Sequence, residues 1–156
     1  MQASTSTRVP ISHAGHVGLN VTNLARSTEF YRAVLGLDVM LESKERAREY
    51  AFLGHDGRIV LTLWQQSDRG FDPERAGLHH LSFEVDGIER VREAQRALKA
   101  LGVEIRYEGI VPHAEGLDSG GIYFDDPDGA RLEIYAKTGA GSHAAPTPGA
   151  PTCGFF

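Results

Sequence analysis

The sequence contains two similar halves, and this internal repeat limits the possible folds of the chain more than any other feature. Setting His16 on His80, an offset of 64 residues, superimposes the apolar alternations "HVGLNV" and "HLSFEV". In both copies a helical stripe of apolar residues follows and ends at a glycine, Gly36 or Gly102, where a left-handed C-terminal cap is favoured. A repeat of this length indicates two copies of one supersecondary unit.

Three strands follow each helix, because apolar and polar residues alternate with a period of two. Asp-Gly pairs at 56–57 and 128–129 predict a hairpin turn in each half. Asp86 and Glu89 resemble a capping box at the start of the second helix. The predicted strands cover residues 15–21, 38–43, 49–53 and 58–64, and then 79–85, 103–107, 119–125 and 130–136. The predicted fold class is therefore α+β, with two tandem βαβββ modules and the helices on one side of a mixed or antiparallel sheet.

The 156 residues suit a single domain with its own core. Gly, Ala and Pro dominate the end of the chain, a composition that predicts little burial. Phe155 and Phe156 could dock on a neighbouring subunit or belong to a loose tail. The predicted divisions are a flexible N-terminus (1–11), one domain (12–137, with module one at 12–66 and module two at 77–137) and a Gly/Ala/Pro-rich tail (138–156).

Charge and composition exclude several partners. A formal net charge of −5 and a pI near 5.8 argue against nucleic acid, since phosphate binding needs a basic surface. The sequence has neither an apolar run long enough to span a membrane nor a signal-like start. Cys153, the only cysteine, cannot form an internal disulfide. We therefore expect a cytoplasmic protein with a small-molecule partner.

Two histidines and a glutamate share one face of the predicted sheet. Side chains alternate between the faces of a strand, so His16, His80 and Glu133 lie opposite the apolar residues that pack on the helices. Two neutral imidazoles and one carboxylate can hold a divalent metal and leave positions open for substrate. Iron(II) is favoured, and manganese, zinc, nickel or cobalt also suit this ligand set.

The other histidines rank lower as ligands. His79 precedes His80 and is predicted to point to the opposite face of the strand. His13, His55 and His143 fall in a terminal segment, a turn and the tail, where surface roles are expected.

The paired modules with "HVGLNV", "HHLSFEV" and "IYFDDPDGARLEIY" resemble the vicinal oxygen chelate superfamily over residues 12–137. Its members include glyoxalase I, extradiol dioxygenases, fosfomycin-resistance thiol transferases and metal-free bleomycin-binding proteins. The resemblance implies a curved, barrel-like mixed sheet with helices on the outer face, and a homodimer. It also implies a metal, held by His16, His80 and Glu133, that chelates two neighbouring substrate oxygens.

One position separates this chain from glyoxalase I, whose members usually supply a fourth ligand, a glutamate, from the last strand of the first module. That strand is "RIVLTLW" here. Aligning the Asp-Gly turns puts Leu61 at this place, whereas aligning the strand faces puts Val60 or Thr62 there. None is an acid, so the carboxylate that would shuttle a substrate proton is missing.

Extradiol dioxygenases match better at two residues. Tyr123 lies ten residues before Glu133, as the active-site tyrosine of that class does, and its strand alternation turns it to the cleft. His113, in the long loop 109–121, resembles the second-sphere histidine of the class. A match for the catalytic base expected shortly before His80 is missing, since Trp64 and two glutamines occupy that region.

The leading prediction is therefore a metal-dependent, extradiol-type dioxygenase-like enzyme. Tyr123 would hydrogen-bond a substrate oxygen and His113 would close the pocket, while Trp64 is either an apolar pocket wall or a core or interface residue. One alternative keeps the metal and changes the reaction to glyoxalase-like isomerase or lyase chemistry, or to thiol transfer onto an antibiotic. The other is a metal-free drug-binding resistance protein, a class that usually lacks the three ligands.

Overall fold

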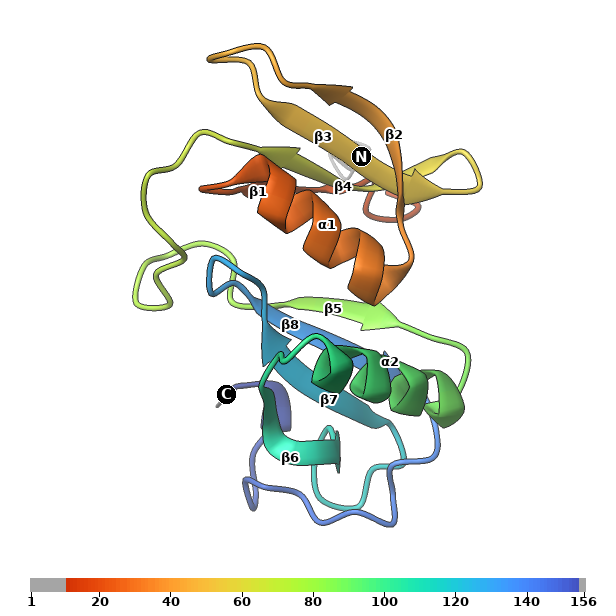
Figure 1. Cartoon of the computed structure of the whole chain (residues 1–156). Helices are drawn as coiled ribbons and strands as arrows, with labels where there is room; N and C mark the ends of the chain where they lie inside the picture. The colour runs from red at the N-terminus through yellow and green to blue at the C-terminus, as the bar shows by residue number, and fades with distance from the viewer. Residues whose placement is uncertain (1–10, 155–156) are drawn as a thin grey trace, which may run out of the picture.

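The structure is a computed structural model that describes residues 11–154, and it has the predicted order βαβββ twice (Figure 1). A short 3-10 turn, η1, ends the described chain. The first module contains β1 (Val17–Asn20), α1 (Leu24–Leu35), β2 (Asp38–Ser43), β3 (Tyr50–His55) and β4 (Arg58–Trp64). The second contains β5 (Leu81–Glu84), α2 (Ile88–Ala100), β6 (Ile105–Pro112), β7 (Gly120–Asp125) and β8 (Arg131–Ala136), followed by η1 (Thr152–Gly154).

Each module forms its own four-stranded mixed sheet, in the order β1-β4-β3-β2 or β5-β8-β7-β6. The first strand of each module runs parallel to the last strand, and the remaining pairs are antiparallel. The α+β class and the duplicated modules are thus confirmed. The sheets curve but do not close into a barrel, so β1 and β5 each keep one open edge.

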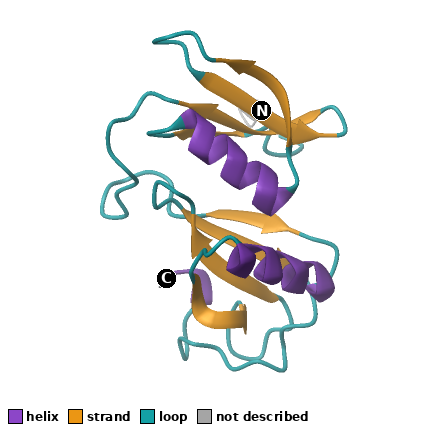
Figure 2. Ribbon diagram, viewed as in Figure 1, coloured by secondary structure: helices purple, strands orange, loops and turns teal. Residues whose placement is uncertain are grey.

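Each helix covers one face of its sheet (Figure 2). Apolar side chains fill the space between helix and sheet. Leu53, Leu61 and Leu63 are fully buried in the first module. The second module buries Ile122, Phe124, Leu98 and further apolar residues in the same core cluster. Helix α1 lies between its own sheet and β5 (Figure 1). The helix-free face of the first sheet therefore points away from the second module.

A polar latch joins the two modules. The Tyr31 hydroxyl donates to Asp126 Oδ2 at 2.8 Å inside the core. The backbone N–H of Thr22 donates to Asp128 Oδ2 at 2.9 Å, and Arg26 forms an ion pair with the same carboxylate. The loop between β7 and β8 thus holds the start and middle of α1, which fixes how the modules pack.

The helix ends follow the predicted glycines but not the predicted capping box. Gly36 closes α1 with a φ of 65°, and Gly102, with a φ of 71°, follows the end of α2. The N-cap of α2 is Gly87, which has no side chain to cap the helix, so Asp86 lies one residue outside it. Glu89 pairs instead with Arg92 on the helix surface. The predicted capping box is wrong for this reason.

The predicted long loop 109–121 is shorter in the structure, because β6 continues to Pro112. A bulge interrupts the pairing of β6 with β7 between Arg106 and Val111. Within it Tyr107 and Glu108 take left-handed backbone angles, with φ of 58° and 60°. His113 therefore follows directly from a strand rather than standing in a free loop.

The tail packs more than its composition predicts. Ala140 and Thr152 are both fully buried against the second module. Phe155 and Phe156, on which the docking prediction depends, lie outside the described residues, as do residues 1–10 of the predicted flexible N-terminus.

Among the helices of residues 11–154, none combines the length and the apolar character needed to cross a membrane.

Candidate functional site

Glu133 lies at the centre of the helix-free face of the second module. It occupies the middle of β8 and is 2% exposed, while its neighbours Leu132 and Ile134 point into the core. Strand pairing sets Ser82 on one side of it and Tyr123 on the other. A buried carboxylate in this position needs hydrogen-bond donors around it.

His113 supplies one of those donors, since its Nε2 lies 2.6 Å from Glu133 Oε1. The strand register sets Ser82 and Tyr123 next to the carboxylate, and both side chains favour its charged form. Burial alone would raise the pKa of Glu133, but these three side chains outweigh it and the pKa is lowered. The carboxylate is therefore ionised at neutral pH, in the form that binds a metal ion.

His80 lies beside Glu133, with its Nε2 3.8 Å from Glu133 Oε2. Burial lowers the pKa of His80 and is opposed by the charge of Glu133. The ring is therefore neutral at pH 7, as a metal ligand must be.

His79 does not point away from His80, contrary to the prediction. The two rings meet edge to face at 5.1 Å, and their Nδ1 atoms are 2.8 Å apart. The strand β5 begins only at Leu81, so the alternation of faces does not extend to these two residues.

His113 is held on three sides. Besides Glu133, its Nδ1 lies 2.9 Å from Ser119 Oγ, and its ring packs against Tyr135 at 5.0 Å. The imidazole therefore bridges the buried carboxylate and the loop that leads into β7.

Tyr123 is fully buried on the same face and stacks edge-on against Tyr107 at 5.8 Å. Val111 and Cys153 complete a small apolar cluster apart from the main core. Burial first, and the negative charge of Glu133 second, raise the pKa of Tyr123 far above its ordinary value. The phenol therefore stays protonated and is a hydrogen-bond donor.

The first module has no acid at the place of Glu133. Strand pairing sets Thr62 opposite Gly18, as it sets Glu133 opposite Ser82. Leu61 is fully buried in the main core and cannot face the site, so aligning the Asp-Gly turns gives the wrong residue. Aligning the strand faces gives Thr62, which is the residue equivalent to Glu133. The Thr62 hydroxyl accepts a hydrogen bond from Trp64 Nε1 at 3.1 Å.

The structure brings His80, His113, Tyr123 and Glu133 together, but not His16. His16 is exposed in the first module, just before β1. Within residues 11–154 of one chain, no three His, Cys, Asp or Glu side chains are arranged to hold a metal ion. The predicted set of three ligands is therefore divided between two faces of the chain.

The sequence did not predict a functional role for three neighbours of the site: Ser82, Ser119 and Tyr135. The position of Ser82 two residues after His80 carried a usable signal, because register sets it against Glu133. Ser119 and Tyr135 reach His113 only through the tertiary fold.

An aromatic cluster occupies the helix-free face of the first module. The rings of Tyr50, Phe52 and Trp64 lie 5.3 to 5.7 Å apart and are only partly buried. Trp64 is thus a surface-facing member of an aromatic patch rather than a core residue. Such a patch is typical of a binding surface.

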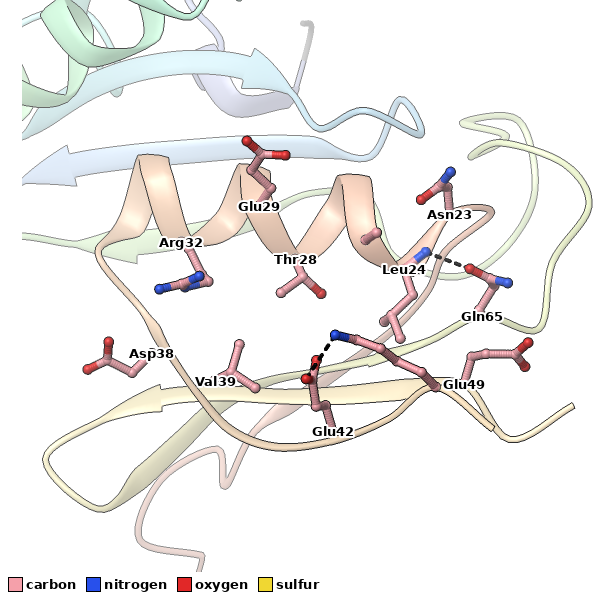
Figure 3. A pocket seen from close by; sticks show the side chains of 12 residues that line it. Asn23, Leu24, Thr28, Glu29, Arg32, Asp38, Val39, Glu42, Glu49 and Gln65 are labelled. Carbon is pink, nitrogen blue, oxygen red and sulfur yellow. Dashed lines mark hydrogen bonds and ion pairs between the residues drawn. The ribbon is translucent and has the colours of Figure 1, made fainter. Parts of the chain in front are cut away.

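A separate hollow of about 750 Å³ lies between α1 and the rim formed by β2 and the approach to β3 (Figure 3). Its lining is charged, with the acids Glu29, Asp38, Glu42 and Glu49 and the bases Arg32 and Lys44. Gln65 accepts from the backbone N–H of Leu24 at 2.6 Å. None of the predicted site residues lines it, so it lies apart from the cluster around Glu133.

Comparison with known proteins gives a consistent picture. The family model described as the Glyoxalase/Bleomycin resistance protein/Dioxygenase superfamily matches residues 13–134. The uncharacterized protein YaeR of Escherichia coli is 30% identical over 78% of this chain and 94% of its own length. A catechol-2,3-dioxygenase of Bacillus subtilis is 29% identical over 80% of this chain, and the match covers only 41% of the length of that enzyme. The metallothiol transferase FosB of Staphylococcus haemolyticus is 31% identical over 80% and 84% of the two chains.

Solved structures share the fold. A glyoxylase/bleomycin resistance protein/dioxygenase domain from Frankia matches with a TM-score of 0.70 and 23% identity, over 86% of this chain and 98% of its own. The fosfomycin resistance protein FosX of Listeria monocytogenes, a mutant bound to Mn(II) and a dihydroxypropylphosphonic acid, matches with a TM-score of 0.64 and 24% identity. The match covers 83% of this chain and 95% of that one.

Proposed function

The chain belongs to the glyoxalase/bleomycin resistance protein/dioxygenase superfamily, and on that premise we propose that it is a divalent-metal-dependent enzyme. Its substrate would be a small molecule that offers two neighbouring oxygens, and its reaction the ring cleavage of a catechol by oxygen. The observation that carries this proposal is the buried Glu133 beside His80, with the Tyr123 phenol and the His113 imidazole next to the same carboxylate.

The donor set suits iron(II) or manganese(II). A carboxylate and a neutral imidazole are ligands for both, and two ligands of one ion can lie up to about 4.2 Å apart when each bond is near 2.1 Å. The 3.8 Å between His80 Nε2 and Glu133 Oε2 falls within that limit. The third ligand, His16, would come from a second copy of the chain, so the enzyme would be a homodimer.

Two features support a second copy as the source of His16. His16 directly precedes β1, a strand of the first sheet. The helix-free face of that sheet points away from the second module of the same chain (Figure 1). The open edges of β1 and β5 are available for association, and the partly buried patch of Tyr50, Phe52 and Trp64 lies on this face. Joining the first module of one copy to the second module of the other would cover both faces at once.

Bound in this site, a divalent metal would supply Lewis-acid chemistry and a template for two substrate oxygens. Tyr123, kept protonated by its surroundings, would donate a hydrogen bond to Glu133 or to a substrate oxygen. His113 would hold the second oxygen of Glu133 and keep the carboxylate in place. The aromatic patch would give a flat substrate an apolar surface.

The choice of ring cleavage over isomerisation follows from Thr62. A hydroxyl that accepts from Trp64 cannot replace the carboxylate that a proton-shuttling isomerase needs at this place. The test is oxygen uptake by protein loaded anaerobically with iron(II) and given catechol or 3-methylcatechol. We expect uptake that Glu133→Gln abolishes, and no uptake with either catechol would overturn the proposed reaction.

Thiol transfer to an antibiotic is the second candidate, and the likeness to FosB supports it. The match spans 84% of FosB, whereas it spans only 41% of the catechol dioxygenase. Manganese-loaded protein incubated with fosfomycin and cysteine separates the two reactions. A cysteine–fosfomycin adduct without oxygen uptake would establish the transferase.

A further inference from the structure

We propose that the C-terminal turn, η1 (Thr152–Gly154), forms one side of the candidate site, with Thr152 as the residue that positions His113. The tail's composition predicted little packing, and nothing in the proposed chemistry requires this turn. Its contact with a bound ligand rests on the proposed function, whereas its hold on His113 is independent of any metal.

Thr152 is tied to the segment that carries His113. It is fully buried, its backbone N–H donates to His113 O at 2.7 Å, and its hydroxyl donates to Pro112 O at 2.6 Å. These bonds supply donors to two consecutive carbonyls at the end of β6. The turn therefore fixes the backbone from which the His113 ring reaches Glu133.

Cys153 brings the turn against the site itself. Its side chain packs with Val111, Tyr107 and Tyr123 in the small apolar cluster, separate from the main core. Tyr123 lies opposite Glu133 in the pairing of β7 with β8, so this cluster is next to the carboxylate. The turn thus lies over the same face as the proposed ligand Glu133.

The bulge in β6 serves this arrangement. Left-handed angles at Tyr107 and Glu108 are costly for residues other than glycine. They set the Tyr107 ring edge-on to Tyr123, and its hydroxyl approaches Thr152 O at 3.4 Å. Bulge and turn together enclose the phenol of Tyr123, so a substrate group directed toward Tyr123 would meet Cys153.

The hold on His113 is tested in metal-free, full-length protein by comparing Thr152→Val with Thr152→Ser. Valine keeps the shape but leaves Pro112 O without its donor, so the turn should open more often. We expect iodoacetamide to alkylate Cys153, the only thiol, about tenfold faster in Thr152→Val, and the ring 15N signals of His113 to shift. Thr152→Ser keeps the hydroxyl that donates to Pro112 O, so both readouts should stay at their wild-type values.

The signals of His55, in the first module, report whether the fold survives and should not move. If Thr152→Val keeps the wild-type value of either readout, Thr152 does not position His113. If Thr152→Val fails to fold, the full-length variant Thr152→Ala replaces it, and unchanged His113 signals in that variant would overturn the proposal.

The contact with ligand is tested with manganese(II) and catechol. Bound catechol should slow alkylation of Cys153 about tenfold, and Cys153→Phe should weaken catechol binding by a similar factor without displacing manganese. Ser142→Phe, on an exposed part of the same tail, is the matched control and should change neither. Catechol binding that leaves Cys153 equally reactive would refute the contact. Absence of manganese binding would refute the proposed function, and the metal-free comparison would then decide the role of Thr152.

Discussion

Two buried carboxylates, Glu133 and Asp126, have pKa values that move in opposite directions. Burial is the largest influence on both. At Glu133 the donors His113, Ser82 and Tyr123 outweigh it. At Asp126 the bonds from Tyr31 and the backbone do not, and the charge of Asp128 adds to the effect of burial. The charged form of Glu133 is thus favoured by its neighbours, while the pKa of Asp126 is raised inside the latch between the modules.

Replacing Tyr123 by phenylalanine removes one donor from Glu133. We expect the pKa of Glu133 to rise and the free energy of unfolding to fall by about 1 kcal/mol, the usual net value of one hydrogen bond. Carboxyl 13C NMR titration measures the first and urea unfolding the second. Tyr107→Phe is the control, because the Tyr107 hydroxyl approaches Thr152 O and not Glu133. A Glu133 pKa that stays the same in Tyr123→Phe would contradict the assigned contact.

Asp126 predicts a specific pH dependence of stability. Its pKa is raised in the folded state, so the folded protein binds more protons than the unfolded chain. In the unfolded chain an aspartate has a pKa of about 3.9. Its contribution is fully present below that value and is lost as the pH rises through the folded pKa. Asp126→Asn should therefore become less destabilising, relative to wild type, between about pH 4 and 7. The urea midpoints of wild type and Asp126→Asn, measured across this range, test the prediction. A difference between the two midpoints that stays constant with pH would contradict it.

Among the elements, the strands followed from the sequence because their side chains must alternate between core and solvent. The same alternation identified Tyr123 and Thr62 as residues of the helix-free face. It gave no information at His79, which precedes β5, or at Tyr107, where a bulge shifts the register. The role of Thr152 had no local signal, because its partners lie about 40 residues away. Periodic structure was therefore predictable, whereas contacts made by irregular segments were not.

The pairing of β7 with β8 is expected to tolerate no side chain at Gly121. A Cβ there would lie 2.0 Å from Ile134 O, a backbone atom that cannot move without breaking the sheet beside Glu133. Gly121→Ala should lower the free energy of unfolding by about 3 kcal/mol. Gly15→Ala, which meets no atom within 4 Å, should leave it nearly unchanged. Equal urea midpoints for the two variants would show that the strands are not packed this closely.

At the scale of the whole molecule, the two modules place their equivalent faces apart. Helix α1 and the latch at Asp126 and Asp128 hold the modules together through their helical sides. The proposed metal ligands therefore fall on two surfaces of one chain, with His16 on one and His80 and Glu133 on the other. A site that uses all three requires the first module of one copy to meet the second module of another.

Metal binding by mixed variants tests this central claim most directly. His16→Ala and Glu133→Ala should each bind little manganese alone. Refolded together, half of the dimers would be mixed, and each mixed dimer would contain one intact site, so about a quarter of the wild-type manganese sites should return. Recovery near a quarter is the predicted result. No recovery, or full binding by either variant alone, would contradict a site shared between two copies.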